Sequence, residues 1–187
     1  WYTTGKDKLF FFFSYENEET SSAGTTFRAR SAGETAAGNV TRVLKTDLDT
    51  LSAVLKSRFG YDTGAYEGYS FTTPGKKYLG RLDYNINNAN KINFRYLQLD
   101  SSTDQPLSSS SSLGFGRPNN SVNFLSFENS TYAILENIRS YQGEWTSMIT
   151  PTVSNSLLVG WTKQDESRAS KGELFPFVDI LEGGQTY

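Results

Sequence analysis

Carboxylates are the side chains of this chain best suited to acid–base chemistry. Histidine and cysteine are both absent, which excludes disulfides, thiolate or histidine metal centres and every mechanism in which a histidine moves a proton. Two carboxylates can still hydrolyse a glycoside when they flank the scissile bond. No suitable pair is present, because Glu16, Glu18 and Glu19 have the character of the solvated end of a strand. We therefore expect neither an enzyme nor a cofactor.

A second acidic stretch, DSSTD at residues 100–104, raises the question of an oxygen-liganded metal. A calcium loop also needs a glycine at its turn and a closing glutamate, and no such loop is present at this stretch. The sequence therefore favours a solvated loop here and predicts no metal site.

Four further charged residues share one face of two predicted β-hairpins: Arg81, Asp83, Arg95 and Glu144. One interpretation is the charged wall of a lumen, which pairs with a plug or contacts a passing substrate. The other is a solvated sheet face on which charges are tolerated opposite one another. The residue pattern leaves both interpretations open.

Period-two alternation predicts the strands that position these charges. In YLGRLDYNINNANKINFRYLQLD, residues 78–100, apolar and polar side chains alternate on both sides of turn-forming residues at 87–90. The same layout recurs in residues 141–164 around PTVSN at 151–155, where Pro151 suits a turn. The predicted fold class is all-β, with antiparallel up-and-down strands near residues 7–16, 77–87, 91–100, 140–150 and 155–165.

Aromatic side chains mark the apolar faces of these strands: Tyr78, Tyr84, Phe94, Tyr96, Trp145 and Trp161. They suit either a belt at the headgroup level of a membrane or cross-strand packing in a core. In the membrane interpretation they face lipid, and the four charged residues face inward. The run LFFFF at 9–13 then directs Phe11 and Phe13 to lipid, while Phe10 and Phe12 pack inside against a plug. In the alternative, a soluble β-rich binding module, this run is a buried strand.

Two long segments, residues 17–76 and 101–139, are rich in Ser, Thr, Gly and Asn and are predicted to be loops. The first contains one predicted short helix near residues 46–59, with Thr46 as its cap, Asp49 in a capping-box position and Gly60 as its end. Long connections at one end of a sheet and short turns at the other are typical of an outer-membrane barrel.

The totals exclude two further classes of protein. The net charge is −2 and no dense cluster of Lys and Arg is present, so we expect no nucleic-acid partner. No apolar run approaches the roughly 20 residues that a membrane-spanning helix needs. A helical membrane protein is therefore excluded.

Five segments resemble, in the same order, the Oar-like (OmpA-related) TonB-dependent outer-membrane receptors, a family common in Bacteroidota. The first is KDKLFFFFSYE at residues 6–16, which is similar to the segment that opens the barrel of that family. The others are AVLKSRFGYDTGAY at 53–66, GRLDYNINNANKINFRY at 80–96, SNSLLVGWTKQ at 154–164 and FPFVDI at 175–180. The resemblance is collinear over most of the chain.

The resemblance implies a transmembrane β-barrel of about 22 strands, filled by a plug and driven by the inner-membrane TonB complex. Residues 1–187 would then be a single segment of this larger barrel domain in the bacterial outer membrane, with long extracellular loops and with the plug and TonB box outside the segment. Implied partners are outer-membrane lipid, the plug domain of the same protein, the TonB complex and other outer-membrane or surface proteins. The expected function is uptake or handling of a bulky solute, a peptide or glycan. The alternative is a scaffold in a secretion, motility or surface-attachment assembly.

Overall fold

The computed structural model of the chain describes residues 2–4, 8–110, 118–182 and 185–186. Its contacts divide the chain into two compact units. The first, which we call the sheet unit, comprises Trp1–Glu19, Pro74–Ser102 and Leu135–Ser167. The second, which we call the helix unit, comprises Thr20–Thr73, Thr103–Ile134 and Arg168–Tyr187.

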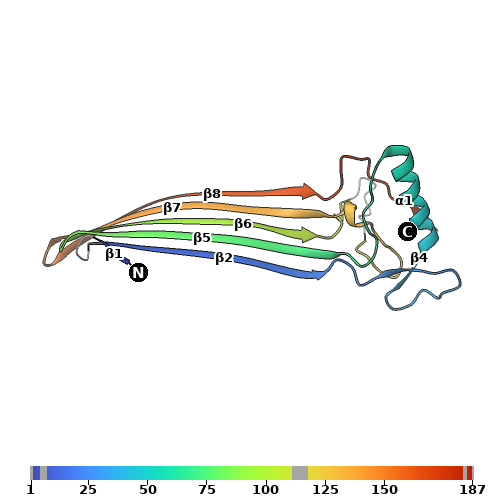
Figure 1. The fold of residues 1–187 in the computed structure, drawn as a ribbon, viewed down its shortest axis with the longest axis horizontal. Helices are drawn as coiled ribbons and strands as arrows, with labels where there is room; N and C mark the ends of the chain where they lie inside the picture. The colour runs from blue at the N-terminus through green and yellow to red at the C-terminus, as the bar shows by residue number, and fades with distance from the viewer. Residues whose placement is uncertain (1, 5–7, 111–117, 183–184, 187) are drawn as a thin grey trace. The chain divides into compact units, whose positions relative to one another are not determined.

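One large sheet dominates the structure, with the strand order β1-β2-β5-β6-β7-β8. Neighbouring strands lie side by side in this order (Figure 1), and the pairings of β1 with β2 and of β5 with β6 are antiparallel. The antiparallel β-rich fold that the alternation predicts is thus confirmed. The strands are β1 (Tyr2–Thr4), β2 (Leu9–Ala23), β5 (Ser70–Asn87), β6 (Asn90–Gln105), β7 (Tyr132–Thr150) and β8 (Val153–Ser170).

Short turns join the strands in pairs, as predicted. Between β5 and β6, the side-chain oxygen Oδ1 of Asn87 accepts hydrogen bonds from the Ala89 N–H at 2.9 Å and the Asn90 amide at 3.1 Å, an arrangement that asparagine favours in turns. Between β7 and β8 the turn is Pro151–Thr152. It is shorter than the predicted PTVSN turn, because Val153 already belongs to β8.

The strands also extend beyond the predicted ends. β2 continues to Ala23, β5 begins at Ser70, β6 continues to Gln105, β7 begins at Tyr132 and β8 ends at Ser170. The added segments of β2, β5, β6 and β8 are rich in polar residues and show no apolar alternation, whereas that of β7 begins with the mostly apolar stretch YAILENI. They are strands because backbone hydrogen bonding between neighbours does not require an apolar face. The predicted loops 17–76 and 101–139 are correspondingly shorter, and residues 111–117 of the second lie outside the described residues.

The helix unit contains the buried core. In it β3 (Arg28–Arg30) pairs in parallel with β4 (Val40–Leu44), followed by α1 (Lys45–Phe59) and the short 3₁₀ helix η1 (Glu128–Ser130). β9 (Leu181–Glu182) pairs with β10 (Gln185–Thr186). The centre of the core consists of Ala29, Val43, Leu48 and Leu125.

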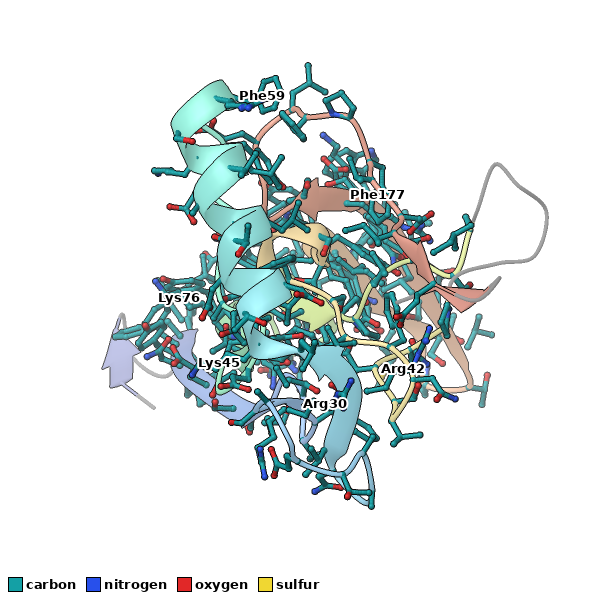
Figure 2. The ribbon with its side chains drawn as sticks, turned by 90° about the vertical axis from the view of Figure 1, so that its right-hand side faces the viewer. Arg30, Arg42, Lys45, Phe59, Lys76 and Phe177 are labelled. Carbon is teal, nitrogen blue, oxygen red and sulfur yellow. The ribbon has the colours of Figure 1, made fainter. Side chains whose placement is uncertain are left out.

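The predicted short helix is confirmed as α1, whose two ends are labelled Lys45 and Phe59 in Figure 2. Its predicted cap is wrong. The N-cap is Leu44, with no side-chain cap bond, and Thr46 lies inside the helix with its hydroxyl 3.5 Å from an Asp47 oxygen. The reason is that β4 continues directly into α1, so no loop residue precedes the helix. Gly60 ends it as predicted, at φ 70°.

Two buried threonines of the helix unit make a matched test of hydrogen bonding in this core. The hydroxyl of Thr131 donates to the Glu128 carbonyl oxygen at 2.6 Å, whereas among the described residues the Thr41 hydroxyl has no hydrogen-bond partner. We expect Thr41→Val to raise the free energy of unfolding by about 1 kcal/mol, because an unsatisfied buried hydroxyl is removed. Thr131→Val should lower it by about 1 kcal/mol, because a satisfied one is lost. Denaturant unfolding followed by circular dichroism measures both, and equal effects of the two substitutions would contradict this assignment.

Candidate functional site

The two faces of the sheet unit differ in chemistry, and the register of β5 and β6 shows which residues share each face. Arg81 lies directly opposite Arg95, and Asp83 opposite Asn93. Directly opposed residues of antiparallel strands project to the same side. Arg81 donates two hydrogen bonds to the Asp83 carboxylate, at 2.8 and 2.7 Å, which balances the like charges of the two arginines.

Glu144 of β7 belongs to the same face. Its carboxylate accepts hydrogen bonds from the Asn93 amide at 2.8 Å and from the Ser156 hydroxyl at 2.9 Å. The structure therefore brings all four predicted charged residues to one side of the sheet, which we call the charged face. Lys77 and Glu16 add a further ion pair to it, at 2.9 Å.

The other side of the sheet unit, which we call the apolar face, carries most of its exposed large apolar side chains. On β5 and β6 the opposed pairs are Leu82 with Phe94 and Tyr84 with Ile92, and all four are exposed. The exposed large apolar residues that alternation assigns to the charged face are fewer: Phe12, Leu97, Met148 and Leu158. The rest, including Phe11, Phe13, Trp145, Leu157, Val159 and Trp161, belong to the apolar face.

A staggered row of aromatic rings crosses the apolar face, with Tyr78 opposite Gln98 and Tyr96 opposite Gly80. The ring centroids of Tyr15 and Tyr78 are 4.9 Å apart, those of Tyr96 and Tyr141 4.9 Å, and those of Tyr141 and Trp161 5.7 Å. These five residues come from five different strands, β2, β5, β6, β7 and β8. We call them the aromatic row. Tyr78, Tyr96 and Trp161 were predicted belt residues, whereas Tyr15 and Tyr141 were missed. Their position at the end of an apolar stripe is the signal that could have found them.

The aromatic row separates two zones of the apolar face. From the row to the hairpin turns, the described residues of this face include no Lys, Arg, Asp or Glu. Beyond Tyr96 the same face becomes polar: Tyr96 donates to Gln98, which lies opposite Tyr78, at 2.8 Å, and Gln98 donates to Asp100 at 2.6 Å. Arg139 also donates to Asp100, at 2.5 Å. The row therefore lies at the boundary between an uncharged zone and a charged one.

The sheet unit has no buried core of its own among the described residues. Every buried residue, apolar or polar, belongs to the helix unit. The edge strand β8 is exposed at every residue except Ala169. Exposed apolar patches of this extent mark a surface that lipid or another protein covers.

The two aspartates of DSSTD, residues 100–104, were predicted to lie in a solvated loop, and this prediction is wrong. Asp100 and Asp104 lie within β6 and not in a solvated loop, because β6 continues past the apolar alternation. Each carboxylate has a cationic partner: Arg139 for Asp100, in the sheet unit, and Lys171 for Asp104, in the helix unit. The described residues contain no group of three or more potential metal ligands.

The run of phenylalanines at residues 10–13 lies in β2. Because Tyr15 contacts Tyr78 on the apolar face, alternation assigns Phe11 and Phe13 to that face and Phe10 and Phe12 to the charged face. Phe13 is the most exposed of the four. Whether lipid covers the one pair and a plug the other stays a prediction.

Comparison of the chain with protein-family models, with curated proteins and with solved structures finds no match. None of the helices in the described residues is both long enough and apolar enough to cross a bilayer.

Proposed function

We propose that the sheet unit is an arc of a transmembrane β-barrel in the bacterial outer membrane, with its apolar face toward lipid. The aromatic row carries this proposal, because a girdle of amphipathic rings at the edge of a charge-free band is what a bilayer interface selects. The band from Tyr78 to Ile86 is about 27 Å long at ~3.4 Å per residue. Tilted by roughly 40°, it spans about 21 Å, close to the ~25 Å apolar band of such barrels.

The charged face is then the lumen wall. Its ion pairs and hydrogen bonds stabilise side chains that contact water, a plug or a passing solute. β8 forms one edge of the sheet, and beyond β2 lies only the short β1, which pairs with Leu9–Phe11. The rest of β2 and nearly all of β8 are exposed, and an exposed edge of that length normally pairs with a further strand. In the arc these further strands belong to the remainder of the same barrel.

The function that fits best is that of a segment of a TonB-dependent receptor, which takes up or handles a bulky solute such as a peptide or glycan. The collinear resemblance of five segments to the Oar-like receptors supports it. The segments of the helix unit connect the strand ends that lie past the aromatic row, so in this topology they face the cell exterior. There they are suited to capture a solute before it enters the lumen.

The membrane orientation is tested by the depth of two tryptophans, Trp161 in the aromatic row and Trp145 in the band. The full chain, with either tryptophan alone retained and the other tryptophans replaced by Phe, is folded into vesicles whose lipids carry bromine at defined depths. We expect shallow bromines to quench Trp161 best and deep bromines to quench Trp145 best, because four residues along β7 separate Trp145 from the row by about 14 Å.

The control is a water-soluble quencher, acrylamide, on the same two variants. The proposal expects little acrylamide quenching of Trp145 in vesicles. A chain in which acrylamide quenches both tryptophans fully and no brominated lipid quenches either is a soluble module, and the barrel proposal is then wrong.

The scaffold alternative is favoured by one observation, the exposed apolar segment near the C-terminal end. Leu174, Phe177 and Val178 are all exposed there, as in a surface that another protein covers. Purification of the complete protein from native membranes separates the two functions. Co-purification of the TonB complex supports uptake, whereas stoichiometric surface proteins without it support the scaffold.

A further inference from the structure

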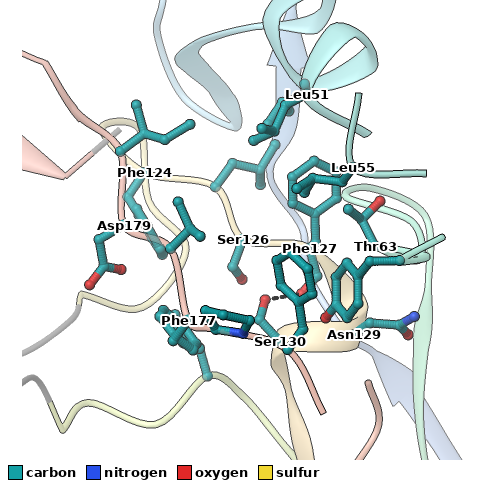
Figure 3. A pocket seen from close by; sticks show the side chains of 18 of the residues that line it. Leu51, Leu55, Thr63, Phe124, Ser126, Phe127, Asn129, Ser130, Phe177 and Asp179 are labelled. Carbon is teal, nitrogen blue, oxygen red and sulfur yellow. Dashed lines mark hydrogen bonds between the residues drawn. The ribbon is translucent and has the colours of Figure 1, made fainter. Parts of the chain in front are cut away.

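The helix unit contains a cavity of about 410 Å³ that the sequence did not predict. Its walls come mainly from three segments far apart in the chain: α1, residues 124–130 and residues 170–180. Figure 3 shows Leu51 and Leu55 of α1 on one side and Phe177 on another. The volume lies within the range of small-molecule sites.

Apolar side chains line this cavity from its buried part to its exposed part. Leu48, Phe124 and Leu125 are buried, with no more than 6% of their surface exposed. Phe177 and Val178 line the same cavity and are 49% and 56% exposed. An apolar ligand that enters the cavity covers these exposed side chains. Its binding is favourable because it removes apolar surface from water on both partners.

Polar groups in the wall are already engaged inside the protein. The Ser126 hydroxyl donates to a side-chain oxygen at 2.9 Å, and the Thr63 and Ser130 hydroxyls donate to backbone carbonyl oxygens at 3.1 and 2.6 Å. Asp47 and Asp179 also interact with other groups of the protein. A sugar would compete with the hydroxyl bonds, because each hydroxyl has only one hydrogen to donate. An apolar ligand leaves them intact.

Contacts at the start of residues 170–180 hold this part of the wall in place. Phe175 stacks on Tyr61 with ring centroids 4.4 Å apart, and both residues line the cavity. The Lys171 N–H donates to the Thr131 carbonyl oxygen at 3.2 Å. A wall that is already held loses little conformational entropy when a ligand binds, which favours affinity.

We propose that this cavity binds the apolar side chains of a peptide, in preference to a sugar of similar size. The aliphatic and aromatic groups of the ligand lie between α1 and residues 175–178. In the receptor function proposed above, on which this identification rests, the ligand is the solute, so the solute is a peptide and not a glycan. The binding itself belongs to the helix unit and does not require that the sheet unit lie in a membrane.

Three uncharged, water-soluble probes test the preference: the dipeptide acetyl-Leu-Phe-amide, its backbone control acetyl-Gly-Gly-amide and the disaccharide N,N′-diacetylchitobiose. Binding to the full chain in detergent micelles is measured by isothermal titration calorimetry, with empty micelles as the blank. We expect acetyl-Leu-Phe-amide to bind at least tenfold more tightly than either other probe, because it alone buries large apolar side chains. Equal or tighter binding of either other probe, or no binding of acetyl-Leu-Phe-amide above the blank, overturns the proposal.

Matched variants locate the binding. Leu51→Trp fills the cavity and should abolish binding of acetyl-Leu-Phe-amide, whereas Val54→Trp, at an exposed residue of the same helix outside the wall, should not. Val178→Ser removes an exposed apolar side chain of the wall and should weaken binding at least threefold. Leu174→Ser makes a similar change at a fully exposed residue outside the wall and should have no effect. Undiminished binding in both Leu51→Trp and Val178→Ser would show that the dipeptide binds elsewhere.

The ligand class and the barrel arc fail separately. If the brominated lipids quench the two tryptophans as expected but acetyl-Leu-Phe-amide does not bind, the ligand class is wrong and the barrel arc stands. If the dipeptide binds as expected but no brominated lipid quenches either tryptophan, the barrel arc is wrong and the preference of the cavity for apolar side chains stands.

Discussion

Leu157→Arg is expected to destabilise the vesicle-bound chain by about 2–4 kcal/mol, the cost of an arginine on the lipid face of a barrel near the bilayer midplane. Leu157 lies on β8, on the same side as Trp161 of the aromatic row and roughly midway from that row to the turn at Pro151–Thr152. A guanidinium there has to leave water or distort the bilayer. Denaturant titration in vesicles, followed by tryptophan fluorescence, measures the loss.

The matched control is the next residue. Leu158 is on the same strand and at the same depth, but alternation assigns it to the charged face, together with Ser156, which bonds Glu144. Its exposed fraction of 57% is close to the 52% of Leu157. We expect Leu158→Arg to cost less than about 1 kcal/mol, because that face tolerates charge. Equal, small effects of both substitutions would support the soluble module.

Asp104→Asn is expected to destabilise the helix unit by about 2–3 kcal/mol. The Asp104 carboxylate accepts hydrogen bonds from the Lys171 ammonium at 2.8 Å and from the Thr72 N–H at 2.9 Å. The two side chains of the ion pair are only 9% and 21% exposed. The amide keeps the shape and an acceptor for Thr72, but it leaves the mostly buried Lys171 ammonium with only the more distant Glu128 carboxylate, at 3.8 Å, as a counter-charge. Circular dichroism of α1 during denaturant unfolding reports the change.

A double-mutant cycle separates this pair from other effects. Lys171→Met combined with Asp104→Asn should cost less than the sum of the two single substitutions. Asp62→Asn is the control, because Asp62 also pairs with a lysine, Lys56 at 3.0 Å, but both side chains are more than half exposed. We expect it to cost under about 1 kcal/mol. Additivity of the two single substitutions would contradict the assigned ion pair.

The same carboxylate gives the helix unit a pH dependence. Burial alone raises the pKa of Asp104, but the hydrogen bonds from Lys171 and Thr72 outweigh it and hold the pKa below its ordinary value. A carboxyl with a lowered folded-state pKa adds stability above its unfolded pKa of about 4 and loses it as the pH falls through the folded pKa. Asp104→Asn should therefore remove part of the acid sensitivity of the unfolding midpoint below about pH 4.

The two faces of the sheet unit could be predicted from the sequence, since alternation in a strand is a local property. Alternation along β5 and β6 places Tyr84 and Phe94 on one face and Arg81 and Arg95 on the other. The observed register agrees with that grouping. The hairpin turn at Asn87–Asn90 and the end of α1 at Gly60 are also determined by nearby residues. The strand ends were not, because the backbone pairing that extends β6 to Gln105 leaves no signal in side-chain polarity.

Only the tertiary structure could decide features that depend on the alignment of distant segments. Tyr96, Tyr141 and Trp161 form a row only because the register between their strands places them at one level. The cavity forms only where α1 and residues 170–180 meet. The partner of Asp104 is Lys171, the residue that directly follows β8. The sequence by itself thus determined the chemistry of each strand face. The three-dimensional fold decided which aromatic rings, cavity-lining segments and ion-pair partners come together, because such contacts depend on how distant segments align and not on sequence spacing.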